Sequence, residues 1–227
     1  MAPKNIHIEL EVTLRCNTKC PHCDRHCDIL SQPDTDMSID QINRFCEEVI
    51  KRGHVGLVSV LGGEPSLHPD IEYILMRLAV LKDYGYIATL IYATNGILPL
   101  PVNVTEDFTV YNSPVRYKHH HRMDISPTEE GVIYASPCPI AEGCGIALNC
   151  FGYWPCGAGG AICRLLDIPD MVRYSLSTAS DWDYDTMCRH CAHGAATQHP
   201  TTDFSTPASP VFTTALQNWQ GYKGRRY

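Results

Sequence analysis

Three closely spaced cysteines constrain this chain more than any other feature of its sequence. Cys16, Cys20 and Cys23 follow directly after an apolar, β-branched run from Ile6 to Leu14. The run predicts a strand, and a tight loop after it would bring the three thiols around one point. Thiolates this close together suit a soft metal ion or an iron–sulfur cluster. Because a structural site normally has a fourth protein ligand, three cysteines favour a cluster with one open iron.

Two further motifs stand at the ends of predicted strands. Leu61-Gly62-Gly63-Glu64-Pro65 ends the apolar run 55–61, and Ala93-Thr94-Asn95-Gly96 follows the run 87–92. Glycine lets the backbone approach a ligand closely, and a carboxylate accepts hydrogen bonds from an ammonium group. Both motifs therefore have the composition of ligand-binding loops.

Helical patterns separate these strands. Ser38 and Gln41 form a capping box before an apolar stripe, and a second stripe runs from Ile71 to about Lys82. Strand, helix, strand, helix, strand is typical of a parallel sheet with right-handed crossovers. Such sheets bind ligands at the carboxyl ends of their strands, where all three motifs are expected to lie.

The three motifs, in this order, resemble the radical S-adenosylmethionine (SAM) superfamily. The resemblance implies that Cys16, Cys20 and Cys23 hold a 4Fe-4S cluster whose open iron binds SAM. It also implies that the SAM-binding residues include Gly62, Gly63, Glu64, Pro65 and Asn95. The implied fold is α/β, a partial and open TIM-like βα barrel with a small cysteine-rich C-terminal module.

The resemblance also suggests how the chain is divided. Residues 1–115 are expected to form the radical SAM core, 116–202 an auxiliary cluster module, and 203–227 a C-terminal tail. Only about three and a half of the family's six βα units fit before the second group of cysteines. A short fourth strand is expected near 108–111, and the barrel should be open on one side.

The second group of cysteines resembles the auxiliary-cluster modules called SPASM or, in their short form, twitch. Residues 146–154 are expected to form a hairpin that brings Cys144 and Cys156 to neighbouring strands. The predicted ligands of one auxiliary 4Fe-4S cluster are Cys144, Cys156, Cys188 and Cys191, with Cys138 as the alternative to Cys144. A zinc site built from the same four residues is the competing interpretation, and zinc could not carry electrons.

Composition narrows the class of protein. The formal net charge is −7, which argues against a nucleic-acid partner, and no apolar run is long enough to span a membrane. Without a secretory signal pattern the expected location is the cytoplasm, where thiols stay reduced. The chain has 12 cysteines, clustered before residue 47 and after residue 137, and this favours two metal centres over a disulfide framework.

The function that follows from the resemblance is that of an enzyme. Reductive cleavage of SAM to a 5′-deoxyadenosyl radical would allow hydrogen-atom abstraction from a small substrate resembling a sugar, cyclitol or nucleoside. An auxiliary cluster favours a two-electron oxidation, that is, a dehydrogenase reaction, with a flavodoxin- or ferredoxin-like protein as the external electron donor. No single catalytic side chain is predicted, and the substrate is not specified.

Three alternatives stay open. A thiol that returns a hydrogen atom would make the enzyme an epimerase, with Cys27, Cys150 and Cys163 as the spare cysteines. Modification of a peptide is the second alternative, and a non-catalytic metal-binding scaffold is the third. A separate ambiguity concerns Glu9 and Glu11, which alternate with apolar residues in the first strand and face either solvent or a barrel lumen.

Overall fold

The computed structural model describes residues 6–20, 23–27, 30, 34–112, 143–180, 182–188, 190–191 and 210–227. Cys138 lies outside these residues. The strands are β1 (His7–Thr13), β2 (Val55–Gly62), β3 (Ile87–Thr94), β4 (Phe108–Asn112), β5 (Ile146–Asn149) and β6 (Gly152–Trp154). The first four agree with the sequence prediction within a few residues.

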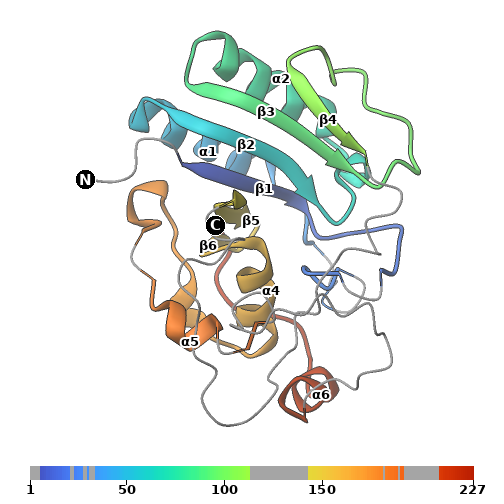
Figure 1. Ribbon diagram of the computed structural model, residues 1–227, viewed down its shortest axis with the longest axis vertical. Helices are drawn as coiled ribbons and strands as arrows, with labels where there is room; N and C mark the ends of the chain where they lie inside the picture. Colours follow the sequence, from blue (N-terminus) through green and yellow to red (C-terminus); the bar gives the residue numbers. More distant parts are fainter. Residues whose placement is uncertain are drawn as a thin grey trace.

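The six strands form one open sheet in the order β4-β3-β2-β1-β5-β6 (Figure 1). Within the described residues β1 to β5 run parallel to one another, and β6 pairs antiparallel with β5. The first four strands follow the order expected of consecutive right-handed crossovers. A sheet of this kind is consistent with a partial radical SAM barrel.

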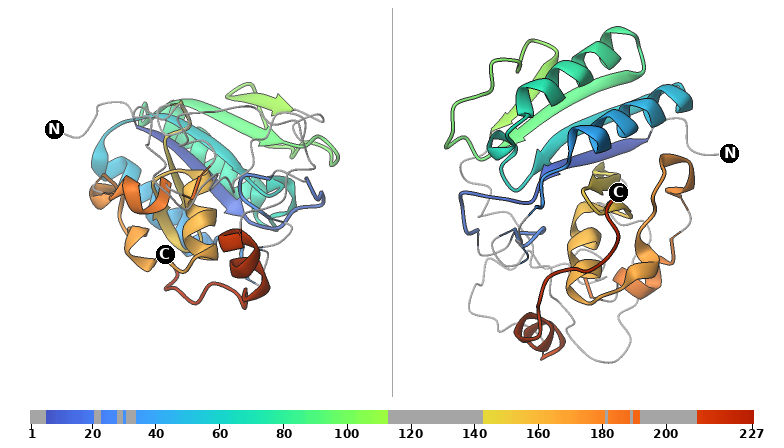
Figure 2. Two further views of the ribbon diagram at one scale, coloured as in Figure 1. Left: turned by 60° about the horizontal axis from the view of Figure 1, so that its bottom comes forward. Right: turned by 180° about the vertical axis from the view of Figure 1, so that it is seen from behind.

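Two long helices cover one face of the sheet (Figure 2). Helix α1 (Ile39–Arg52) begins at the predicted capping box, since the Ser38 side chain accepts from the Gln41 amide and the Gln41 side chain accepts from the Ser38 amide. It ends at Gly53, whose φ of 89° is the left-handed cap that glycine adopts most easily. Helix α2 (Ile71–Asp83) packs against β3 and α1.

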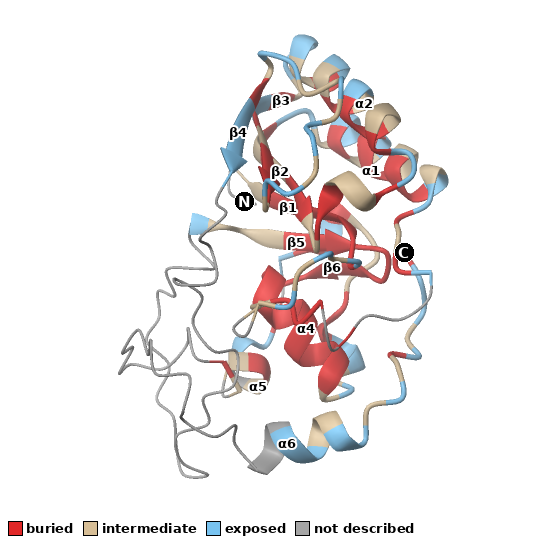
Figure 3. Cartoon of the chain, turned by 90° about the vertical axis from the view of Figure 1, so that its right-hand side faces the viewer, coloured by how far each residue is buried: buried red, intermediate tan, exposed pale blue. Residues whose placement is uncertain are grey.

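The predicted hairpin forms from β5 and β6, and it extends the same sheet on the free side of β1. Helix α4 (Gly157–Leu165) follows and is buried along its whole length (Figure 3). The shorter helices α5 (Tyr184–Cys188) and α6 (Pro210–Gln217) come later. Because β5 pairs directly with β1, one sheet contains strands from both the expected core and the expected module. The division into domains therefore stays a prediction.

Three cysteines are fully buried among apolar residues. Cys46 lies in α1, Cys150 in the β5–β6 turn and Cys163 in α4, all with 0% exposure. Free cysteine behaves as a small apolar side chain in such places. The described cysteines form no disulfide.

Candidate active site

The three sequence motifs meet at one cavity at the carboxyl ends of β1, β2 and β3. Its lining includes the thiols Cys16, Cys20 and Cys23 from the loop after β1. Gly62 and Gly63 line it from the end of β2, and Ala93, Thr94 and Asn95 from the end of β3. Parallel strands deliver their carboxyl ends to one edge of the sheet, so residues almost eighty positions apart become neighbours.

The cysteine loop is ordered by local contacts of its own thiols. The Thr18 hydroxyl lies 3.1 Å from Cys16 Sγ and 3.6 Å from Cys20 Sγ, which holds these two thiols on one side of the loop. Cys23 forms a hydrogen bond with Cys27, and this bond lowers the pKa of the Cys23 thiol although burial opposes it. Cys27 is itself buried and also lines the cavity.

The two glycines allow β2 to end directly against β1. A Cβ atom on Gly62 would stand 2.1 Å from the Thr13 carbonyl oxygen, and one on Gly63 would stand 2.1 Å from the Arg15 carbonyl oxygen. The same backbones are paired, since the Gly63 amide donates to Thr13 O at 2.9 Å and the Glu64 amide donates to Arg15 O at 2.8 Å. Larger residues would therefore separate this motif from the cysteine loop.

Glu64 connects the second motif to the third. Its carboxylate is fully buried and accepts from the Thr94 hydroxyl at 2.9 Å and from the Asn95 amide at 2.9 Å. It also accepts from the Ser66 amide at 3.1 Å, capping the 3-10 turn η1 (Pro65–Leu67). Among the described residues, the cavity lining does not include Glu64 or Pro65. The carboxylate therefore orders the cavity wall in this structure, and its expected contact with an ammonium group stays a prediction.

Asn95 connects the third motif to the first. Its side-chain amide donates to Asn17 Oδ1 in the cysteine loop at 2.7 Å. Together with the Glu64 contacts, this bond closes a ring of interactions around the cavity: cysteine loop, end of β2, end of β3, and back to the cysteine loop.

The chemistry of this cavity fits an iron–sulfur cluster with one open iron. Four thiols line it, and its remaining wall is built from glycine, polar side chains, the charged residues Asp24 and Arg25, and the apolar residues Leu61 and Ala93. Within the described residues no three metal-binding side chains are already arranged around one ion position. The fit therefore rests on the kind of donor, since thiolates are the usual ligands of such a cluster.

Part of the second cysteine group also comes together. The Cys156 thiol caps α4, where it accepts from the Gly159 amide at 3.2 Å. Burial raises its pKa well above the usual range, and the nearby thiols of Cys191 and Cys188 raise it further. Cys144 instead forms a hydrogen bond with Glu9, and burial together with that carboxylate raises its pKa to about 11. Within the described residues no three metal-binding side chains surround one ion position, so the auxiliary ligand set stays a prediction.

An ion-pair network under the cysteine loop has no counterpart in the motif analysis. Arg25 Nε donates to Glu11 Oε1 at 2.9 Å, and its two terminal nitrogens pair with Glu9 and Asp24, each at 2.8 Å. Glu9 is 9% exposed and Glu11 only 1%, so these carboxylates face the interior and the solvent-facing interpretation is wrong. The sequence pattern could not show this, because charged residues that alternate with apolar ones are equally typical of a strand with one face in solvent.

Comparison with known proteins finds a match to a superfamily model over part of the chain. Residues 10–108 match the Radical SAM superfamily model. The GTP 3′,8-cyclase of Mesorhizobium japonicum is 30% identical over 91 residues, which cover 40% of this chain and 27% of that protein. The 7-carboxy-7-deazaguanine synthase of Haemophilus influenzae is 26% identical over 125 residues, 55% of this chain and 53% of that protein. The chain thus spans about half or less of these relatives.

Among solved structures, one that matches most of the chain has a similar fold. It is BtrN in complex with AdoMet and 2-DOIA, with a TM-score of 0.53 and 16% sequence identity over 83% of this chain and 87% of that one. At this identity the likeness shows a shared fold.

Within the described part of the chain, no helix has the length and apolar character needed to cross a membrane.

Proposed function

Because residues 10–108 match the Radical SAM superfamily model, we propose that this chain is a radical SAM enzyme that binds a 4Fe-4S cluster through Cys16, Cys20 and Cys23. The observation that carries this proposal is the single cavity lined by these thiols and by Gly62, Gly63 and Asn95. With cluster and SAM bound, one-electron reduction would split SAM and provide a 5′-deoxyadenosyl radical, which removes a hydrogen atom from the substrate.

The chain's own residues supply position and exclusion of water. Gly62 and Gly63 let the backbone approach SAM, and Asn95 offers a side-chain amide at the cavity wall. Glu64 acts one step further back, by fixing Thr94 and the Asn95 amide. Preorganised polar groups of this kind orient a ligand without rearrangement during the reaction.

The proposed substrate is a small molecule resembling a sugar, cyclitol or nucleoside, and the proposed reaction is a two-electron oxidation. Fold likeness to BtrN, solved with AdoMet and 2-DOIA, supports a small molecule, and relatives named for GTP and deazaguanine chemistry support a nucleoside-like one. An auxiliary 4Fe-4S cluster would accept the second electron. Its proposed ligands are Cys156, Cys188 and Cys191 with either Cys144 or Cys138. An external one-electron donor completes the system.

Epimerisation is the second candidate, and one observation favours it. Cys27 lines the same cavity as the three proposed cluster ligands, in hydrogen-bond contact with Cys23. A thiol at that place could return a hydrogen atom to a substrate radical. Deuterium from the solvent would then enter the product, whereas a dehydrogenase would leave an oxidised product instead.

The test uses anaerobically reconstituted protein, SAM and dithionite, with 5′-deoxyadenosine as the product measured. We expect the wild type to form it and the C16A/C20A/C23A variant to form none above background, with about four fewer irons per chain. A C46A variant is the control, because Cys46 is buried in α1 away from the cavity. Equal SAM cleavage by the triple variant would contradict the proposal.

A further inference from the structure

The Arg25 network, defined as Glu9, Glu11, Asp24 and Arg25, contacts both cysteine groups of the molecule. Arg25 itself lies in the cysteine loop, two residues after Cys23. Each of its three guanidinium nitrogens pairs with a different carboxylate, at 2.8 to 2.9 Å. Burial works against its charge, but Asp24, Glu9 and Glu11 outweigh burial and raise the pKa of Arg25 well above its usual value. The loop is therefore fixed to β1 through a permanent cation.

The network continues into the β5–β6 hairpin. The Asn149 side-chain amide donates to Glu11 Oε2 at 2.8 Å, and Asn149 Oδ1 accepts from the Trp154 indole and the Phe151 amide, both at 3.0 Å. Asn149 and Trp154 are both fully buried. Every bond from Arg25 through Glu11 and Asn149 to the hairpin is buried. These bonds therefore fix the position of the cysteine loop relative to the β5–β6 hairpin.

The network also reaches the start of α4 and the segment before β5. Glu9 forms a hydrogen bond with Cys144. A Cβ atom on Gly157 would stand 2.6 Å from an Arg25 terminal nitrogen and 2.7 Å from Glu9 Oε2. Gly157 follows Cys156, so the ion pair lies directly against the residue after a proposed auxiliary ligand. Only a residue without a side chain leaves room for the pair at this place.

We infer that Arg25 is a positioning residue for both metal centres: through Glu9 and Glu11 it aligns the cysteine loop with the Cys144–Cys156 segment. The inference rests on the proposed function for the identity of the two centres, but the alignment itself is a property of the protein without metal. One guanidinium paired with three carboxylates suits this role, because arginine donates from a rigid planar fork that lysine does not have.

The first arm of the test measures amide hydrogen exchange in the metal-free protein by mass spectrometry. We expect Arg25→Gln to raise exchange about tenfold in peptides covering 23–27 and 143–157, with α1 unchanged. Arg25→Lys should not restore protection. Faster exchange confined to 23–27 would overturn the inference, because Arg25 would then order only its own loop.

Two glycine variants make the test independent of charge removal. Gly157→Ala keeps every charge but places a methyl group against the paired ends of Arg25 and Glu9. It should therefore raise exchange in the peptides covering 23–27 and 143–157, as Arg25→Gln does. Gly143→Ala is the matched control, because a Cβ atom there meets nothing within 4 Å, and it should leave both segments unchanged. If Arg25→Gln also raises exchange in α1, that variant has unfolded as a whole. The exchange measured for Gly157→Ala against Gly143→Ala then decides.

The second arm measures bound iron in the C16A/C20A/C23A background, where only the proposed auxiliary site remains. Adding Arg25→Gln should lower the remaining iron at least about threefold, although Arg25 is not a ligand. Unchanged iron would overturn the inference for the second centre. Absence of SAM cleavage in the wild type would instead contradict the proposed function and leave the exchange result standing.

Discussion

The two cysteine groups of this chain differ in how completely the fold assembles them. At the carboxyl edge of β1, β2 and β3, three motifs line one cavity and are linked by Glu64, Asn95 and Asn17. In the second group, Cys156 lies near Cys188 and Cys191, whereas Cys144 is held by Glu9. The first site is built from the ends of adjacent strands. The second depends on loops and short helices that are joined by long connections.

The difference between the two cysteine groups indicates which ligand positions the fold sets without bound metal. Strand ends in a parallel sheet are positioned by the sheet's own hydrogen bonds, so a site built there needs no metal to gather its residues. Ligands on loops rely on the metal itself for part of their order, since metal binding and folding are coupled. The first site should therefore tolerate metal removal better than the second.

The largest expected effect comes from removing the second group while keeping the first. The C156A/C188A/C191A variant should lose about four irons per chain and all substrate oxidation, yet still form 5′-deoxyadenosine. Metal analysis and product analysis by mass spectrometry check this. Loss of zinc in place of iron would show that the second group is a structural zinc site. Loss of 5′-deoxyadenosine as well would show that the two sites do not separate as described.

A smaller effect is expected from Glu64→Gln, which tests how the first site is built. An amide in place of the carboxylate loses charge-assisted bonds and turns a donor toward Thr94 or Asn95, so the free energy of unfolding should fall by about 2–3 kcal/mol. Urea unfolding of the metal-free protein measures it.

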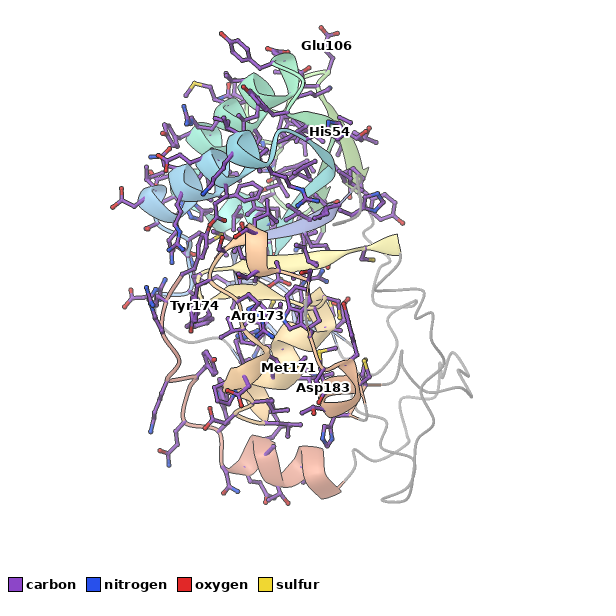
Figure 4. All side chains as sticks on the ribbon, turned by 90° about the vertical axis from the view of Figure 1, so that its left-hand side faces the viewer. His54, Glu106, Met171, Arg173, Tyr174 and Asp183 are labelled. Carbon is purple, nitrogen blue, oxygen red and sulfur yellow. The ribbon has the colours of Figure 1, made fainter. Side chains whose placement is uncertain are left out.

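The control for this variant is Glu106→Gln. Glu106 is exposed and projects outward at the far end of the molecule (Figure 4), so its change should be within about 0.5 kcal/mol. If Glu64→Gln left the unfolding midpoint unchanged and weakened SAM binding alone, Glu64 would be a ligand contact and not part of the frame.

The smallest expected effect concerns the half-exposed pair that supports the cysteine loop from outside. Asp36 accepts from Arg15 at 2.7 Å and from the Thr13 hydroxyl at 2.5 Å. Burial alone would raise the pKa of Asp36. The bonds from Arg15 and Thr13 together lower it by more, so the pKa lies below the ordinary value of 3.8. Asp36→Asn should cost about 0.5–1 kcal/mol at neutral pH.

The pH dependence of this pair has a definite sign. A carboxyl with a depressed pKa in the folded state stabilises the fold above its unfolded pKa and loses this contribution as the pH falls through the folded value. The difference between wild type and Asp36→Asn in thermal unfolding should therefore be constant above about pH 5 and shrink below pH 3.8. A difference that grew in acid would contradict the assigned pairing.

The sequence alone predicted the parts of the fold that depend on local pattern. Strands β1 to β4, the Ser38–Gln41 capping box and the β5–β6 hairpin follow from alternation, helix caps and turn residues. The meeting of the three motifs followed from parallel topology. Pairing of β5 with β1 was not predictable in this way, because it joins residues about 140 positions apart and neither strand carries a mark of its partner.

The Arg25 network was missed for a related reason. In the sequence, each of its carboxylates looks like an ordinary charged residue. Only the structure, in which Glu11 is 1% exposed, shows that the Glu11 carboxylate must be paired. Glu64 is the opposite case: its motif pointed to a ligand contact, and its neighbours Ser66, Thr94 and Asn95 use the carboxylate to hold the cavity wall.

The most direct test of the central claim is electron–nuclear double resonance on the reduced, reconstituted protein with SAM labelled at its amino nitrogen and carboxylate oxygens. If SAM binds the cluster held by Cys16, Cys20 and Cys23, both labels should show magnetic coupling to the cluster in the wild type and in C156A/C188A/C191A. No coupling is expected in C16A/C20A/C23A. Coupling that persisted in the latter variant and vanished in the former would place SAM at the second cysteine group and contradict the account.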